Sequence, residues 1–232
     1  MKTAFGVTLA LATAFATALS SAALAAPQHV RVRGTIASVS STTLVVKTAD
    51  GKDVSVALNG NTHYLQVAKA SLNNIEPGSY IGTATKSVGP LMVALEVVIF
   101  PPSMKGSGEG HYGWDKIPDT TLSGTGATTS TMTNGSVTAM SATPSAGVNS
   151  TMTNGSVSSD MSKNGAQQLT VTYKGGEQRI IVPPTAPIVT FRPGTMAELT
   201  PDARVFINAV ENGSTITAGA VAVGIGGAQP PM

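Results

Sequence analysis

One short stretch of the chain carries side chains that could hold a metal ion. Glu109, His111 and Asp115 lie close together in the sequence, and a divalent cation of hard or borderline character can bind carboxylate and imidazole groups together. Their spacing matches no established zinc motif, and a catalytic zinc ion needs three protein ligands in a fixed geometry. Two interpretations stay open. Either this loop binds a divalent metal, or Tyr112 and Trp114 rest on a folded domain while the histidine and the aspartate form local hydrogen bonds.

Other patterns that support catalysis are missing from the sequence. The chain contains no cysteine, which excludes thiol nucleophiles, thiolate metal sites and disulfide bonds. It has no Gly-x-Ser-x-Gly motif, no phosphate-binding Gly-x-x-x-x-Gly-Lys-Ser/Thr loop and no paired carboxylates for glycoside hydrolysis. His29 and His63 stand alone on expected strands, where we interpret them as exposed or hydrogen-bonded imidazoles. We therefore expect a non-enzymatic protein without a cofactor, the divalent metal being the one alternative.

Residues 1–26 have the layout of a cleavable secretory signal peptide. Lys2 precedes an apolar run of Ala, Leu and Phe, which ends in the small-residue triplet Ala23-Leu24-Ala25. An uncleaved anchor is the alternative. No later segment approaches the ~18 consecutive apolar residues of a membrane span. We expect the mature chain to be periplasmic or secreted, without a transmembrane span.

The charge balance argues against a polyanionic partner. The chain has 14 Lys and Arg residues against 12 Asp and Glu, and loss of Lys2 with the signal peptide leaves a mature net charge of about +1. Such a chain produces no strong field for nucleic acid. We interpret Arg31 and Arg33, on one face of an expected strand, as a solvated face or the guard of a sheet edge. The expected partner is an envelope protein or a small ligand, not nucleic acid.

From Val30 onward, apolar and polar residues alternate with a period of two, which is typical of β-strands. The runs TTLVVKT and DVSVAL flank Asp50-Gly51, a strong signal for a β-hairpin and in its simplest form a two-residue type I′ turn. The stretch SLNNIEPGS indicates a helical turn or loop that stops at Pro77-Gly78. The apolar run LMVALEVVIF is typical of a central strand.

The second half of the sequence repeats this order of elements. QQLTVTYKGGEQRIIV corresponds to the hairpin, with Gly175-Gly176 at its turn, and TMAELTPDARVFINAV corresponds to SLNNIEPGSYIGTATK. We predict an all-β fold with two copies of one unit, at residues 28–102 and 150–226, followed by a tail, 227–232. A small antiparallel sheet exposes its edges unless it closes, and a partly closed Greek-key barrel of the OB type is the economical solution. A single larger sandwich built from both halves is the alternative.

Residues 103–149, rich in Gly, Ser, Thr and Pro, are predicted to be a flexible linker, with its GEGHYGWD segment pinned to a barrel surface. The octapeptide STMTNGSV occurs in it at 130–137 and again at 150–157. We interpret the copy at 150–157 as the first strand of the second unit and the copy at 130–137 as duplicated linker. A binding motif is the competing interpretation.

Several short motifs together resemble a known family. In chain order they are Gly108-Glu109-Gly110-His111, Trp114-Asp115, Met152-Thr153-Asn154 and Tyr173-Lys174-Gly175-Gly176-Glu177. In this order the chain resembles a family of exported bacterial proteins of unknown function with tandem small OB-like β-barrel repeats. Its members are sometimes described as permeases of metal ABC transporters, but a permease needs several membrane spans and the mature chain offers none. The resemblance implies a fold and a compartment, not a mechanism.

Overall fold

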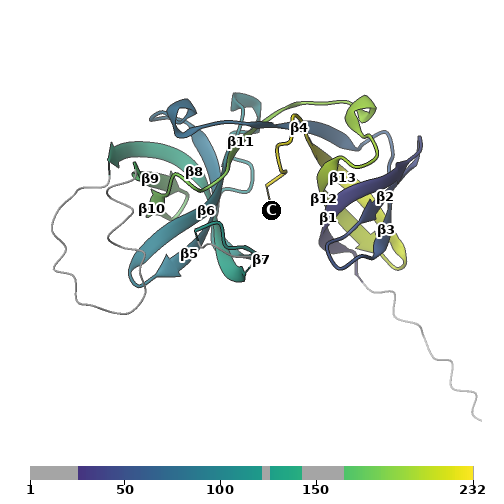
Figure 1. Ribbon diagram of the computed structural model, residues 1–232, viewed down its shortest axis with the longest axis horizontal. Coiled ribbons are helices and arrows are strands. Elements are labelled where there is room, and N and C mark those ends of the chain that lie inside the picture. Colours follow the sequence, from purple (N-terminus) through teal and green to yellow (C-terminus); the bar gives the residue numbers. More distant parts are fainter. Residues whose placement is uncertain (1–25, 122–125, 143–164, 232) are drawn as a thin grey trace, which may run out of the picture.

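In the computed structural model the chain is all-β, as the alternating pattern predicts (Figure 1). The structure describes residues 26–121, 126–142 and 165–231. The predicted signal peptide, apart from Ala26, and the octapeptide copy at 150–157 lie outside the described residues. Thirteen strands form one continuous sheet, and the helical elements of the described part are three short 3-10 turns. None of its helices is long and apolar enough to cross a membrane.

Five strands close into a first ring through their hydrogen-bonded pairings. They are β1 (Gln28–Val39), β2 (Thr43–Lys47), β3 (Asp53–Ala57), β12 (Arg204–Asn212) and β13 (Thr215–Gly224). The order around the ring is β1-β2-β3-β13-β12 and back to β1, and the one parallel pairing joins β3 to β13. Apolar side chains from every strand meet inside, with Leu44, Val56 and Ile207 fully buried. Strands far apart in the sequence therefore share one core.

A second ring has the same order of strands and the same directions. Its members are β8 (Ala127–Ala142), β9 (Gln167–Tyr173), β10 (Gly176–Val182), β6 (Leu91–Ile99) and β5 (Tyr80–Val88). The parallel closure now joins β10 to β6. Leu169, Ile180 and Ile81 are fully buried in its core. The two rings are thus repeats of one arrangement.

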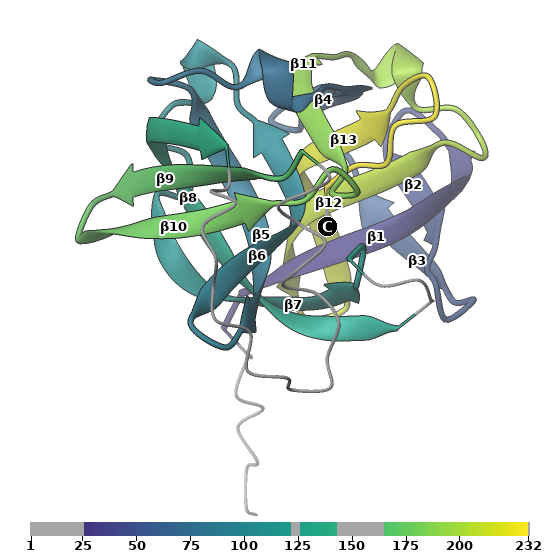
Figure 2. The same cartoon turned by 60° about the vertical axis from the view of Figure 1, so that its left-hand side comes forward.

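Two strands run between the rings and join them, as Figures 1 and 2 show at the top of each view. β4 (His63–Lys69) pairs in parallel with β13, and β11 (Ile188–Pro193) pairs in parallel with β6. β4 and β11 pair antiparallel with each other, with Val67 opposite Phe191. These two residues occupy equivalent positions in the two repeats, so an approximate two-fold axis passes between them.

The structure does not confirm two units that each close on their own stretch of sequence, 28–102 and 150–226. Each ring takes three strands from one repeat and two from the other: β5 and β6 complete the second ring, and β12 and β13 complete the first. The crossing follows β4 and β11, where the 3-10 turns η1 (Leu72–Asn74) and η3 (Met196–Glu198) redirect the chain. η1 confirms the predicted helical turn. The exchange was not predictable because alternation specifies the buried face of a strand, not its neighbour.

Matching irregularities show how closely the rings agree. β1 has a bulge against β2 between Ile36 and Ser38, and β8 has a bulge against β9 between Val137 and Ala139. Two residues before each bulge stands a glycine, Gly34 or Gly135, on which a Cβ would overlap a backbone carbonyl oxygen of the paired strand. Glycine is needed at both positions because the two backbones approach so closely.

The predicted flexible linker, 103–149, is wrong for much of its length. It contains the end of η2 (Pro102–Met104), all of β7 (Gly110–Pro118) and all of β8. The octapeptide at 130–137 is the centre of β8, paired with β5 on one edge and with β7 and then β9 on the other. This strand was not predicted because threonine and serine occupy buried positions in it, so that the sequence shows no apolar alternation. Their hydroxyls are buried in hydrogen bonds. One example is the bond between the hydroxyls of Thr85 and Thr131 (2.9 Å).

Both hairpins form, with turns that differ from those predicted. In the first, the loop between the paired residues Thr48 and Lys52 has three residues, and Gly51 alone has positive φ (81°). That geometry is a turn followed by a glycine bulge rather than the two-residue type I′ form. In the second, the turn is Lys174-Gly175, because Gly176 already pairs with Tyr173.

Candidate functional site

The three predicted metal ligands do not converge on one point. Glu109 Oε1 accepts a hydrogen bond from the Lys174 backbone N–H (2.9 Å), and His111 Nδ1 is 2.8 Å from the Thr133 hydroxyl. Asp115 instead contacts β1, on the other ring. Among the described residues no group of three or more His, Asp or Glu side chains could hold a metal ion. The geometry therefore gives the proposed metal loop no support.

Asp115 links the two rings through a pair of arginines. Its Oδ1 lies 2.9 Å from Arg31 Nη1 and its Oδ2 lies 2.6 Å from Arg33 Nη2. A bulge in β7 between Gly113 and Lys116 turns the aspartate out of the regular alternation. β1 pairs with β12 from Gln28 to Thr35 but with β2 only from Thr35 onward, so beside both arginines one edge of β1 has no paired strand among the described residues. Their interpretation as the guard of a sheet edge therefore stays a prediction. Both arginines are contacts between the rings.

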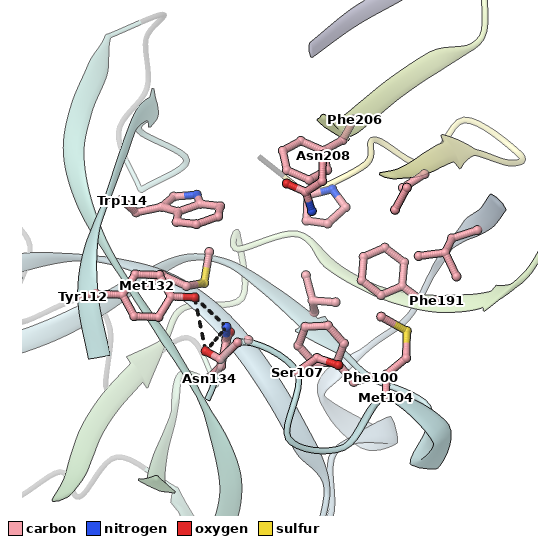
Figure 3. A pocket seen from close by; sticks show the side chains of 17 residues that line it. Phe100, Met104, Ser107, Tyr112, Trp114, Met132, Asn134, Phe191, Phe206 and Asn208 are labelled. Atoms are coloured by element: carbon pink, nitrogen blue, oxygen red, sulfur yellow. Dashed lines mark hydrogen bonds between the residues drawn. The ribbon is translucent and has the colours of Figure 1, made fainter. Parts of the chain in front are cut away.

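Between the rings lies a cavity of about 240 Å³, called here the central cavity. Its aromatic side chains are Phe100, Tyr112, Trp114, Phe191 and Phe206, and Figure 3 shows them facing one another from both sides. They come from β7, β11, β12 and the residue after β6. Both rings and the strands that join them therefore build its wall.

The aromatic wall is held in place by ring contacts and by the arginines. Phe100 lies between Tyr80 and Phe191, with ring centroids 5.6 Å apart in both pairs. The guanidinium of Arg31 lies 3.9 Å from the centroid of the Trp114 ring. A cation over an aromatic face is attracted by the π electrons, so the salt bridges of Asp115 also fix the position of the tryptophan.

Tyr112 and Asn134 form a small hydrogen-bond network in the wall of the cavity. Asn134 Nδ2 donates to the Tyr112 hydroxyl (3.0 Å) and to the Gly108 carbonyl (2.9 Å), and the Tyr112 hydroxyl donates to Gly108 as well (3.2 Å) (Figure 3). Burial raises the pKa of Tyr112. Burial and the Glu109 carboxylate raise the pKa of Tyr80 to about 12. Both phenols therefore stay neutral at physiological pH and serve as hydrogen-bonding groups.

The wall of the central cavity is mostly apolar. Met104, Met132 and Leu65 add flexible apolar surface to the five aromatic rings. The lining contains no histidine, carboxylate or lysine, and its hydroxyl groups are those of Ser107 and Tyr112. An apolar wall with a few placed polar groups is typical of small-molecule sites.

Only part of this site was visible in the sequence. Trp114 and Tyr112 were noticed as aromatic residues that would rest on a folded surface, and both do lie on the wall of the cavity. Phe100, Phe191 and Phe206 were missed because each follows or lies within a strand pattern that predicts only core. The signal that could have drawn attention to them is their rarity, since aromatic residues make up only 4% of the chain.

Comparison of this chain with protein-family models, with curated proteins and with solved structures gave no match. The resemblance to exported tandem-barrel proteins stays a prediction. What the molecule does must be inferred from its own geometry.

Proposed function

We propose that this protein is a non-enzymatic binding protein that holds a small, largely apolar ligand in the central cavity. The proposal keeps the class expected from the sequence and replaces the metal loop with a site between the rings. It also includes export, so that the ligand is met in the periplasm or outside the cell.

The proposal rests on one observation, which is the gathering of phenylalanine and tryptophan side chains around the central cavity. The described residues contain three phenylalanines and one tryptophan, and all four line the central cavity. The ring interiors are filled by Val, Ile, Leu and Ala, whereas the three phenylalanines pack together in a separate apolar cluster beside the cavity. Concentration of rare aromatic side chains around an open space favours recognition of a ligand.

The volume limits the size of that ligand. An engineered apolar cavity of ~150 Å³ binds benzene, and the central cavity measures about 240 Å³. One or two fused rings, or a short branched chain, fit such a space. The two methionines in the wall allow some adjustment of its shape.

The finer description of the fold belongs to the same proposal. A five-stranded ring in which the third strand pairs in parallel with the fifth is the arrangement of an OB-like Greek-key barrel. We propose that each ring is such a barrel, completed by two strands of the other repeat. The ligand then lies between the barrels, in a space that exists because the strand exchange holds them together.

Binding of N-phenyl-1-naphthylamine, a neutral aromatic probe whose fluorescence rises in apolar surroundings, tests the proposal. Trp114 is the only tryptophan in the chain, so energy transfer from tryptophan to the probe reports binding beside the cavity. We expect saturable binding with a Kd of about 1–10 μM, a plausible value for a ligand of this size.

A cavity-filling variant and a matched control locate the binding. Ala220 lines the cavity and is partly exposed, so Ala220→Phe fills the space without entering a ring core and abolishes probe binding. Ala139 is exposed on β8 and does not line the central cavity, so Ala139→Phe leaves binding unchanged. Absence of saturable binding to the parent protein, or equal affinity in the Ala220→Phe variant, would refute the proposed function.

A further inference from the structure

The rings carry equivalent hollows beside the central cavity, and only the second is filled by the chain. Tyr80 donates from its hydroxyl to the Ser107 carbonyl (3.0 Å), and Asn134 donates to the Gly108 carbonyl (2.9 Å). Glu109 accepts from the Lys174 backbone N–H (2.9 Å). The segment between η2 and β7 therefore occupies the second hollow, with the Glu109 carboxylate bound to a backbone amide of the β9–β10 turn.

The corresponding hollow of the first ring is an open cavity of about 410 Å³. Strand register identifies the matching residues: β1 places Thr35 opposite both Lys47 and Arg204, and β8 places Ser136 opposite both Thr172 and Tyr80. Arg33 likewise corresponds to Asn134, since each lies two residues before the pair just named. Three neutral side chains in the filled hollow are thus replaced by three cations in the open one.

The open hollow has three cationic side chains, of which only Arg33 has an acidic partner among the described residues. Arg33, Lys47 and Arg204 line it, and no Asp or Glu does. Within the described part of the chain, Lys47 and Arg204 form no ion pair. Arg33 contacts Asp115, but its Nε is buried and has no hydrogen-bond partner. Like charges gathered without counter-charges are destabilising unless an anion is bound.

The hollow and the central cavity adjoin. Phe206 and Pro231 line both spaces, and the guanidinium of Arg33 lies 4.9 Å from the centroid of the Phe206 ring. A molecule whose apolar part lies among the aromatic residues would reach the cations past this shared wall. By the same register Ala49, which lines the open hollow, corresponds to Lys174, whose backbone N–H donates to Glu109 in the second ring.

We propose that the hollow formed by Arg33, Lys47 and Arg204 binds an anionic group, and that the ligand of this protein is therefore an anionic amphiphile. Its carboxylate or similar group lies where the Glu109 carboxylate lies in the second ring, and its apolar part fills the central cavity. This inference rests on the proposed function and adds the chemical class of the ligand.

Two probes that differ by one anionic group provide the test. 1-Anilinonaphthalene-8-sulfonate is N-phenyl-1-naphthylamine with a sulfonate added, so the ratio of their affinities isolates the contribution of the charge. We expect the sulfonate to bind at least about tenfold more tightly at low salt, the size of one or two charge-assisted contacts. The preference should fall as ionic strength rises, because partly exposed charges are screened.

The decisive variant replaces cationic residues of the open hollow with the neutral residues found at the equivalent positions of the second ring. Arg204→Tyr combined with Lys47→Thr gives the first hollow two of the residues of its neutral counterpart, and both side chains are exposed, so the fold tolerates the change. We expect the affinity ratio of the two probes to fall to about one. Arg179→Tyr combined with Lys52→Thr removes the same charges from exposed positions outside both cavities and leaves the ratio unchanged.

The outcomes separate the two proposals. Equal affinity of both probes for the parent protein, or a sulfonate preference that survives Arg204→Tyr/Lys47→Thr, overturns the anion site and leaves the central cavity as the binding site. Failure of both probes to bind refutes the proposed function and this inference with it. Loss of the preference in that variant alone supports the inference.

Discussion

The first and second rings share a backbone plan and differ in chemistry. Both have five strands in the same order, one parallel closure, a bulge at the same place and a glycine before it. Where the first ring has Arg33 and Phe206 across from each other, the second has Asn134 and Gly82. The strand register and the bulges are the same in both rings because each ring must close around its own apolar core. The side chains that face the space between the rings are free to diverge, and the proposed binding site is built from that difference.

β7 is the largest asymmetry between the rings. It pairs with β8 on the edge opposite β5 and brings Tyr112 and Trp114 to the central cavity. Among the described residues the first ring has no strand in the equivalent place beside β1. One ring therefore presents aromatic side chains from an added strand, and the other presents cations from its own strands. Each half of the site comes from a different ring.

The largest expected effect follows from the exchange of strands between the rings: one repeat produced on its own should not fold. Residues 26–105 retain β1 to β6 but lose β12 and β13, which close the first ring, and β8 to β10, which close the second. The isolated repeat should not fold as a monomer, because both of its halves expose unpaired strands. Circular dichroism with light scattering checks this, and an assembly of two exchanged copies is the folded form compatible with it. A monomer with a cooperative melt would show that each repeat closes on itself.

Substitution of the glycines that precede the bulges tests whether both rings need glycine at this position to the same degree. Gly34→Val and Gly135→Val should each lower the free energy of unfolding by about 4 kcal/mol, because the new side chain meets the backbone of the paired strand. Gly60→Ala is the control: nothing lies within 4 Å of its added Cβ, and we expect a change of less than about 0.5 kcal/mol. Urea denaturation measures all three. A tolerated substitution in one ring alone would show that the equivalence is only approximate.

A buried ion pair distinguishes the second ring from the first. Lys86 Nζ lies 2.6 Å from Asp119 Oδ2, and the first ring has Val210 at the position of the lysine. Burial by itself would raise the pKa of Asp119, but hydrogen bonds from Lys86 and Thr121 outweigh it, so the pKa is lowered. Asp119→Asn leaves the lysine buried without its counter-charge and should cost about 3 kcal/mol at neutral pH.

The pH dependence of that cost follows from the lowered pKa. The aspartate contributes stability at pH values above its unfolded pKa of ~4, and this contribution is lost as the pH falls through the lower folded pKa. Parent and Asp119→Asn proteins should therefore converge in stability on acidification. Denaturant midpoints measured from pH 7 down to pH 2.5 check this. A difference that stays constant over the range would contradict the role of the ion pair.

The repeated octapeptide allows the smallest and most closely matched comparison. Val137, in the first copy, is 1% exposed within the second ring, and Val157 is the same residue of the second copy. Val137→Ala should cost about 2 kcal/mol through the cavity it leaves, and Val157→Ala should cost less than about 0.5 kcal/mol. Thermal melts of the two variants decide which copy supplies β8. The reverse order of effects would restore the interpretation of the first copy as linker.

Much of the secondary structure could be predicted from local pattern. The strands around Leu44, Val56, Leu169 and Ile180 follow the alternation of apolar residues, and the turns at Gly51 and Gly78 lie where glycine permits positive φ. β7 and β8 were not predicted, because β7 buries only one apolar residue, Ile117, and because β8 buries polar residues such as Thr133 and Asn134 beside its apolar ones. The candidate site was the least predictable part, since its residues come from both repeats and from the strand hidden in the supposed linker.

The sequence by itself determined that this protein is all-β and where many of its strands lie. Those properties depend on neighbours along the chain, which a pattern of alternation and turn residues records. The tertiary structure decided which strands pair. The repeats carry the same pattern, so β5 and β6 match β8 and β10 as well as they would match β1 and β3. Local sequence cannot distinguish these partners, because a strand edge offers the same backbone groups to either. The path of the chain through β4 and β11 selects the exchanged partners, and with them the cavity between the rings.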